Sequence, residues 1–190
     1  VLHKLARYEE AVESFDRVLR FKPDDGDAHA NRGTALVALG RYAEALTSYE
    51  SGLAASPDHV PALYGKGNAL AKLGRLEGAL AAYDRALALE PGNADVLGNR
   101  GNVLGRLSRH NEALASFGAA IAAAPGNADA FSNRAIVLMQ LRKYEDALAD
   151  YTTALALKPD YPDAAYGRAS ALVELGRQDE AIQAFEQLLR

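Results

Sequence analysis

Asparagine recurs in this sequence at a spacing that could serve to bind another polypeptide. Five asparagines form two groups in which successive members lie 34 or 68 residues apart: Asn31, Asn99 and Asn133 in one, and Asn68 and Asn102 in the other. An asparagine carboxamide has N–H donors and an acceptor oxygen, so it can pair with both the C=O and the N–H of an extended main chain. The spacing therefore predicts a ladder of amides that holds a peptide without selecting its side chains.

The same interval of 34 residues runs through the whole chain. Prolines, leucines and alanines each recur at this interval, and an aromatic residue follows each alanine by four positions. These residues are Pro23, Pro57, Pro91, Pro125 and Pro159; Leu5, Leu39, Leu73, Leu107, Leu141 and Leu175; Ala11, Ala45, Ala79, Ala113, Ala147 and Ala181; and Phe15, Tyr49, Tyr83, Phe117, Tyr151 and Phe185. A fixed period of this length indicates a repeat architecture. The units fall at 1–25 (partial), at 26–59, 60–93, 94–127 and 128–161 (complete), and at 162–190 (truncated).

Each unit has the pattern of two amphipathic helices joined by a turn. In the first complete unit, Gly40 predicts the end of the first helix, and Pro57, which lacks a backbone N–H, predicts the end of the second. The small residues Gly33 and Ala45 indicate a close helix crossing, with Tyr49 filling the space beside it. Two further prolines fit the first turn of a helix, namely Pro61 and Pro162. An acidic residue opens the second helix in most units, on the favourable end of its dipole: Glu10, Glu44, Glu112, Asp146 and Glu180.

The sequence PGNAD occurs at 91–95 and again at 125–129. Its proline ends one helix pair, and Asp95 or Asp129 is expected to start the next. Aspartates begin the first helices of four units: Asp27, Asp95, Asp129 and Asp163. Their favourable interaction with the helix N-terminus accounts for them more simply than a preference for basic ligands does.

The pattern resembles the tetratricopeptide repeat (TPR), and the resemblance covers the whole chain. In the unit at 26–59 it is carried by Gly33, Leu36, Gly40, Tyr42, Ala45, Tyr49 and Pro57. Gly52 stands where the family usually has alanine, and His29 stands where it often has a large aromatic residue. The repeats are similar to those of bacterial TPR proteins. The pattern NRGN at 99–102 is similar to repeats in the arm of O-linked N-acetylglucosamine transferases, where a ladder of asparagines holds peptide.

The resemblance implies an all-α fold, an α-solenoid of stacked helix-turn-helix repeats that forms a right-handed superhelix. The expected organisation is a single solenoid domain over residues 1–190, with first helices lining a concave groove. The predicted peptide-binding residues are Asn31, Asn68, Asn99, Asn102, Asn133, Tyr64, Tyr166, Lys72 and Arg106. The alternative is that the asparagines are solvated polar residues on an exposed face. The lysine and arginine pattern with which TPR proteins clamp the C-terminal carboxylate of heat-shock chaperones is absent from these positions.

A basic residue occupies one position of every first helix: Arg32, Lys66, Arg100, Arg134 and Arg168. The family usually has an apolar residue there. A helical wheel directs this position toward packing between units, so we expect the side-chain stems to cover apolar surface and the charged heads to meet carboxylates. Asp16, Glu50 and Asp84 are possible partners of the first three residues. An anion-binding ladder is the functional alternative.

Composition excludes several other functions. The net charge is −4, which gives no positive field for nucleic acid, and the chain has no cysteine for disulfide or thiol chemistry. No apolar run has the length of a membrane span, so no membrane insertion is expected. Histidine occurs four times, at His3, His29, His59 and His110, without a second ligand at helical spacing, so no metal or other cofactor is expected. No nucleophile has an identifiable base, so no catalysis is expected either.

These features favour a protein–protein interaction module whose groove binds an extended peptide or a segment of a partner protein. One alternative is the substrate-binding arm of a larger enzyme such as a glycosyltransferase. Another is a scaffold that self-associates through its terminal repeats, because the last helix carries apolar residues with no following helix: Ala181, Ile182, Phe185 and Leu189. The chain is expected to be a fragment of a longer protein, located in the cytoplasm.

Overall fold

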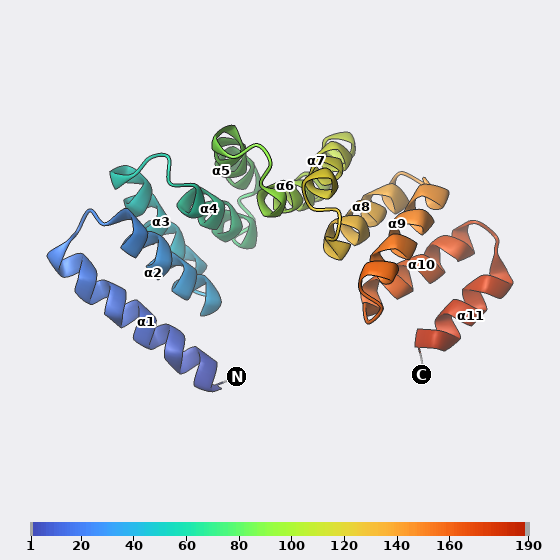
Figure 1. The fold of residues 1–190 in the computed structure, drawn as a ribbon, viewed down its shortest axis with the longest axis horizontal. Helices are drawn as coiled ribbons and strands as arrows, with labels where there is room; N and C mark the ends of the chain where they lie inside the picture. Colours follow the sequence, from blue (N-terminus) through green and yellow to red (C-terminus); the bar gives the residue numbers. More distant parts are fainter. Residues whose placement is uncertain (1, 189–190) are drawn as a thin grey trace. The chain divides into compact units, whose positions relative to one another are not determined.

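The computed structural model describes residues 2–188, and side chains from residue 7 onward. Within that range the chain forms helices and no strands, as the repeat pattern predicts. The chain divides into two compact units, one ending at Pro91 and one beginning at Gly92. Figure 1 shows the helices coloured along the sequence. That the repeats form one continuous domain stays a prediction.

The first unit contains α1 (Leu2–Phe21), α2 (Gly26–Ala38), α3 (Tyr42–Ala55), α4 (Val60–Lys72) and α5 (Leu76–Leu89). Each helix packs on the next one in the chain, and α2 also contacts α4. The helices α2 and α4 are the first helices of their repeats, so the first helices share one side of this unit.

The second unit contains α6 (Ala94–Arg106), α7 (His110–Ala123), α8 (Ala128–Gln140), α9 (Tyr144–Leu157), α10 (Pro162–Glu174) and α11 (Gln178–Leu188). Consecutive helices again pack in series, and α8 contacts both α6 and α10. Three first helices, α6, α8 and α10, therefore lie side by side here.

The partial repeat at the start of the chain departs from the expected pattern. Glu10 was expected to open a second helix, but α1 continues without interruption through residue 21. Ala6 stands where three of the later repeats have glycine, so nothing in the sequence ends the helix there. Glu10 consequently lies inside α1, and the expectation that it opens a helix was wrong.

The turn between the two helices of a repeat requires a left-handed backbone. Gly40, Gly74 and Gly176 adopt φ angles of 75°, 75° and 72° at this turn. The same turn in the two intervening repeats is made by Ser108 and Arg142, both at φ 58°. The expectation that Gly40 ends the first helix is confirmed, since α2 ends at Ala38. In the other two turns a residue with a side chain adopts the same strained conformation.

The PGNAD turn caps the following helix with its asparagine. The Asn93 and Asn127 side chains accept hydrogen bonds from the backbone N–H of Val96 and Ala130, at 3.2 and 3.1 Å. Such a cap satisfies one of the free N–H groups at the helix start. The aspartates Asp95 and Asp129 were expected to start these helices, but they are the second helical residues and only add favourable charge.

Histidine caps α4 at the same position. The Nδ1 atom of His59 accepts from the backbone N–H of Ala62 at 3.1 Å, while its Nε2 lies 2.8 Å from a carboxylate oxygen of Asp27. The cap thus ties the start of α4 to the start of α2. Pro61 lies in the first turn of α4, as the sequence predicts.

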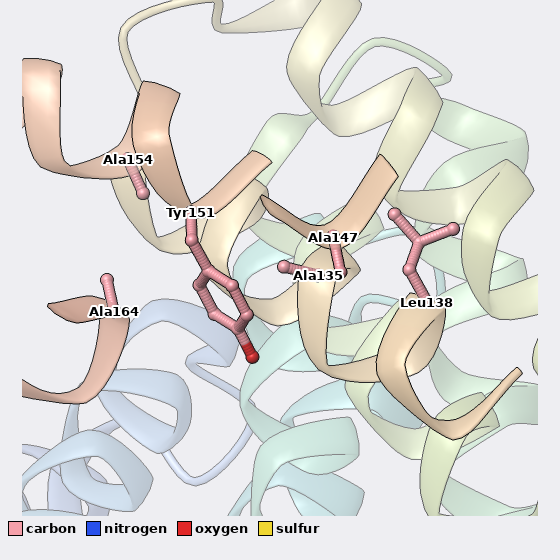
Figure 2. Packing of buried hydrophobic residues seen from close by; sticks show 6 residues of the cluster. All are labelled: Ala135, Leu138, Ala147, Tyr151, Ala154 and Ala164. Atoms are coloured by element: carbon pink, nitrogen blue, oxygen red, sulfur yellow. The ribbon is translucent and has the colours of Figure 1, made fainter. Parts of the chain in front are cut away.

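An alanine and an aromatic residue from the second helix of each complete repeat lie in the core. Ala45, Ala79, Ala113 and Ala147 are fully buried, and the rings four residues later are 1–4% exposed: Tyr49, Tyr83, Phe117 and Tyr151. Figure 2 shows the Tyr151 ring extending from α9 between Ala135 and Ala164, which belong to α8 and α10. Burial raises the pKa of Tyr151 to about 12, with a smaller contribution from nearby Tyr161. The ring thus spaces one first helix from the next.

No helix in the described range is both long enough and apolar enough to cross a membrane.

We expect Ser108→Gly and Arg142→Gly each to stabilise the protein by about 0.5–1 kcal/mol, because glycine removes the cost of a left-handed backbone. The free energy of unfolding from urea denaturation measures this effect. Ser108→Ala is the matched control and should give no gain, because alanine keeps the strained φ angle. Equal stabilisation by alanine and glycine would contradict the assignment of strain to the backbone.

Candidate functional site

One concave feature on the first helices lies in the second unit. A hollow of about 440 Å³ opens between α6 and α8, with the side chain of Phe117 from α7 at its base. Three of the predicted peptide-binding residues line it: Asn102, Asn133 and Arg106. The structure therefore brings together one member of each asparagine group and a cation.

Apolar groups complete this hollow. Ile136, which is 47% exposed, lies on α8 beside Asn133, and Val137 and Phe117 contribute buried apolar surface. Ile136 occupies the same repeat position as Asn68 and Asn102. It was not among the predicted binding residues, because that prediction rested on amide side chains at this position. Asn102 is exposed and Asn133 is half-buried. A surface that combines such amides with an apolar floor can both orient a main chain and bury a side chain.

In the first unit, the amide of Asn68 is already engaged. The hydroxyl of Tyr83 donates to its Oδ1 atom at 2.7 Å, and the Tyr64 ring lies 6.3 Å from the Tyr83 ring. Burial, and then the neighbouring Tyr64, raise the pKa of Tyr83, so its hydroxyl keeps the proton that it donates. Asn68 and Tyr64 therefore each use one side of the side chain for contacts with Tyr83 inside this unit.

The asparagine group that begins at Asn31 is interrupted for a steric reason. Gly65 and Gly167 occupy its missing positions, and a Cβ atom at either one would overlap the ring of Tyr49 or Tyr151. Each ring reaches from the second helix of one repeat to the first helix of the next. The repeat position of Asn31 is thus exposed in one repeat and in contact with an aromatic ring in others. The sequence did not predict this contact.

The remaining predicted residues also lie on the first helices. Asn31 on α2 and Lys72 on α4 are exposed, whereas Asn99 on α6 is half-buried. Tyr166 on α10 is 62% exposed and contacts Phe185 edge-on, with 5.8 Å between ring centroids.

The last helix is partly covered. Ala181 is 3% exposed, Phe185 is half-buried and Ile182 is 57% exposed, while Leu189 lies outside the described residues. The apolar surface that α11 presents is thus smaller than the sequence pattern indicates.

The basic repeat position forms ion pairs with neighbouring second helices. Arg32 donates to Asp16 at 2.7 Å, and the Lys66 ammonium lies 3.1 Å from Glu50. Both contacts agree with the structural interpretation of this position. The predicted pair of Arg100 and Asp84 would join the two units and stays a prediction.

Arg134 pairs in the opposite direction along the chain. Its Nε and Nη2 atoms each donate to the Asp150 carboxylate at 2.6 Å, and Asp150 is only 8% exposed. Gly118 stands where the earlier repeats have their acidic partner, so the guanidinium turns to the second helix of its own repeat instead. The hydrogen bonds that Arg134 donates to the Asp150 carboxylate raise the pKa of Arg134. The sequence did not predict this pair.

Among the described side chains, residues 7–188, no group of three or more His, Asp or Glu residues has the arrangement to hold a metal ion.

Stacked helix pairs with this repeat define an α-solenoid repeat protein. A tetratricopeptide repeat model matches residues 2–59, 30–94, 99–141 and 132–190, and a second tetratricopeptide repeat model matches residues 82–115. The chain therefore belongs to the tetratricopeptide repeat family. The match supports a protein-interaction repeat module as the class of function.

Solved structures share the fold at low sequence identity. MamA from Desulfovibrio magneticus RS-1 superposes with a TM-score of 0.81 at 23% identity, covering 87% of this chain and 94% of that one. YrrB, described as a TPR protein with an unusual peptide-binding site, gives 0.76 at 20% identity, covering 94% and 92%. PilF of Pseudomonas aeruginosa gives 0.79 at 23% identity, covering 88% and 76%. A comparison with curated proteins found no match.

We expect Gly65→Ala to destabilise the protein by about 1–3 kcal/mol, because its methyl group would overlap the Tyr49 ring. Gly98→Ala is the matched control, since it also lies inside a first helix but has no atom within 4 Å of the added methyl group. That variant should be stabilised by about 0.5–1 kcal/mol. Thermal and urea unfolding would show the opposite signs, and the same sign for both variants would contradict the steric account.

We also expect Asp150→Ala to cost about 2–3 kcal/mol of unfolding free energy, because it leaves a partly buried guanidinium without its carboxylate. Asp16→Ala removes the equivalent partner of Arg32 at a site where the carboxylate is 42% exposed, and should cost less than about 1 kcal/mol. Urea denaturation of the two variants gives the comparison. A larger loss for Asp16→Ala would show that burial does not decide the strength of these pairs.

Proposed function

We propose that this chain is a protein-interaction module whose first helices bind an extended segment of another protein. The observation that carries the proposal is the hollow between α6 and α8, where the amides of Asn102 and Asn133 lie beside the apolar surface of Ile136 and Phe117.

The two kinds of group have different roles in binding. Burial of a ligand side chain against Ile136 and Phe117 supplies the hydrophobic part of the binding energy. The amides of Asn102 and Asn133 can pair with the main chain of the ligand on either side of that residue. Arg106 and Gln140, at the ends of their helices, line the same hollow and favour a carbonyl or carboxylate at one end of the segment.

The similarity to YrrB supports this proposal by analogy of fold, because that protein is described as having a peptide-binding site. The stacking of α6, α8 and α10 offers a continuous row of first helices along which an extended segment can lie. Tyr166 on α10 provides a further exposed aromatic surface on the same row.

The test uses peptides selected from a displayed library of random, unstructured sequences for binding to the 190-residue chain. We expect the double variant Asn102→Ala/Asn133→Ala to bind a selected peptide more weakly by about 2 kcal/mol, or roughly thirtyfold, because two amide contacts are lost. Fluorescence anisotropy with a labelled peptide measures the dissociation constant.

Asn111→Ala is the matched control, because Asn111 is an exposed asparagine on the second helix α7. It should leave the affinity unchanged, and circular dichroism should show both variants folded. Equal affinity of the double variant and the original chain would refute the role of the amides. Loss of affinity in the Asn111 variant would place the peptide on another face.

A further inference from the structure

The basic repeat position has one member whose partner is missing. Among the described residues, no group accepts a hydrogen bond from Nε of Arg168, although this atom is buried. Arg32 pairs with the residue 16 positions before it, and Arg134 pairs with the residue 16 positions after it. For Arg168 these two positions are Thr152 and Ala184, so neither source of a carboxylate is present.

The surroundings of Arg168 repeat those of Arg134. Six residues line a hollow at Arg134, and the residue 34 positions after each of them lines a hollow at Arg168. The main chemical difference is that Ala184 replaces Asp150. The hollow at Arg168 therefore contains the guanidinium but not the carboxylate that accepts its hydrogen bonds in the hollow at Arg134.

Open space lies on both sides of the Arg168 side chain. One hollow has a volume of about 270 Å³ and the other about 460 Å³, each far larger than the roughly 30 Å³ that a water molecule takes up in the liquid. They lie along α10 between α9 and α11. Arg168 is two positions from both Tyr166 and Ser170, which is about 200° around a helix. This surface is thus separate from the face proposed above to bind peptide.

We propose that Arg168 binds the carboxylate of an aspartate or glutamate side chain from a partner protein, lying in the trough between α9 and α11. The incoming group takes the place that Asp150 holds beside Arg134. Arg168 is only partly buried, and its rotatable side chain can turn the Nε–H toward such a ligand.

Charge and shape favour a carboxylate on a polypeptide. Asp160 lines one hollow and Glu180 lines the other. Both Glu180 oxygens already accept hydrogen bonds from Arg177. The negative charge of these carboxylates disfavours a doubly charged phosphate more than a singly charged carboxylate. Leu155 and Pro162 border the larger hollow and can contact apolar residues that flank the acidic one. A segment with one acidic residue between apolar residues fits this surface.

The test follows the Nε–H signal of Arg168 by NMR in the ¹⁵N-labelled chain, assigned by its loss in Arg168→Lys. The probes are N-acetyl-Leu-Glu-Ala-amide, its glutamine counterpart, sodium acetate, sodium chloride and inorganic phosphate, all at the same ionic strength. We expect a saturable shift with the glutamate peptide, about tenfold tighter than with acetate because of the flanking apolar contacts, and none with the glutamine peptide or chloride.

The matched variants are Thr152→Asp and Thr152→Asn, at an exposed position. Thr152→Asp places a carboxylate where Asp16 stands relative to Arg32, so it should abolish the saturable shift, whereas Thr152→Asn should preserve it. Equal binding of the glutamine peptide, tighter binding of phosphate, or acetate binding as tightly as the glutamate peptide would each overturn the proposal. So would unchanged binding in Thr152→Asp. None of these outcomes depends on whether peptides bind between α6 and α8.

Discussion

The contact between one aromatic ring and the small residues around it sets the geometry of every complete repeat. A ring such as Tyr49 extends from the second helix, and Gly33 in its own repeat and Gly65 in the next leave it room. The crossing distance of the helices follows from this contact, because close-packed interiors tolerate neither a void nor an extra methyl group. Within each unit these rings hold neighbouring first helices apart, and so they set the spacing of the residues that those helices expose.

Much of the fold could be predicted from the sequence, because its helix ends depend on residues with strong backbone preferences. Gly40 and Pro57 act locally, so their effect is visible in the sequence itself. The continuous α1 was not predicted, since the period indicated a turn that Ala6 does not enforce. The asparagine caps were not predicted. The aspartate two positions after each asparagine was expected to start the helix, but a cap is defined by the conformation of the residue before the helix.

The candidate site was predictable in its location and less so in its detail. The repeat spacing predicted Asn102 and Asn133 as peptide-binding residues, and the structure shows them lining one hollow. The spacing could not show that the Tyr83 hydroxyl occupies one side of Asn68, because that contact depends on how far a ring reaches across a helix pair. The partner of Arg134 was not predicted for a similar reason. The long arginine side chain can reach either the second helix before it or the second helix after it, and only the packing decides which.

The histidine cap of α4 joins the starts of two helices through one ring. Because Nδ1 of His59 accepts from Ala62, the ring is in the tautomer that carries its hydrogen on Nε2, facing Asp27. The imidazole therefore accepts from the backbone of its own helix on one edge and donates to a carboxylate of α2 on the other. The orientation of this ring is fixed at both edges, so the first turns of α2 and α4 cannot shift past one another without breaking one of the two contacts.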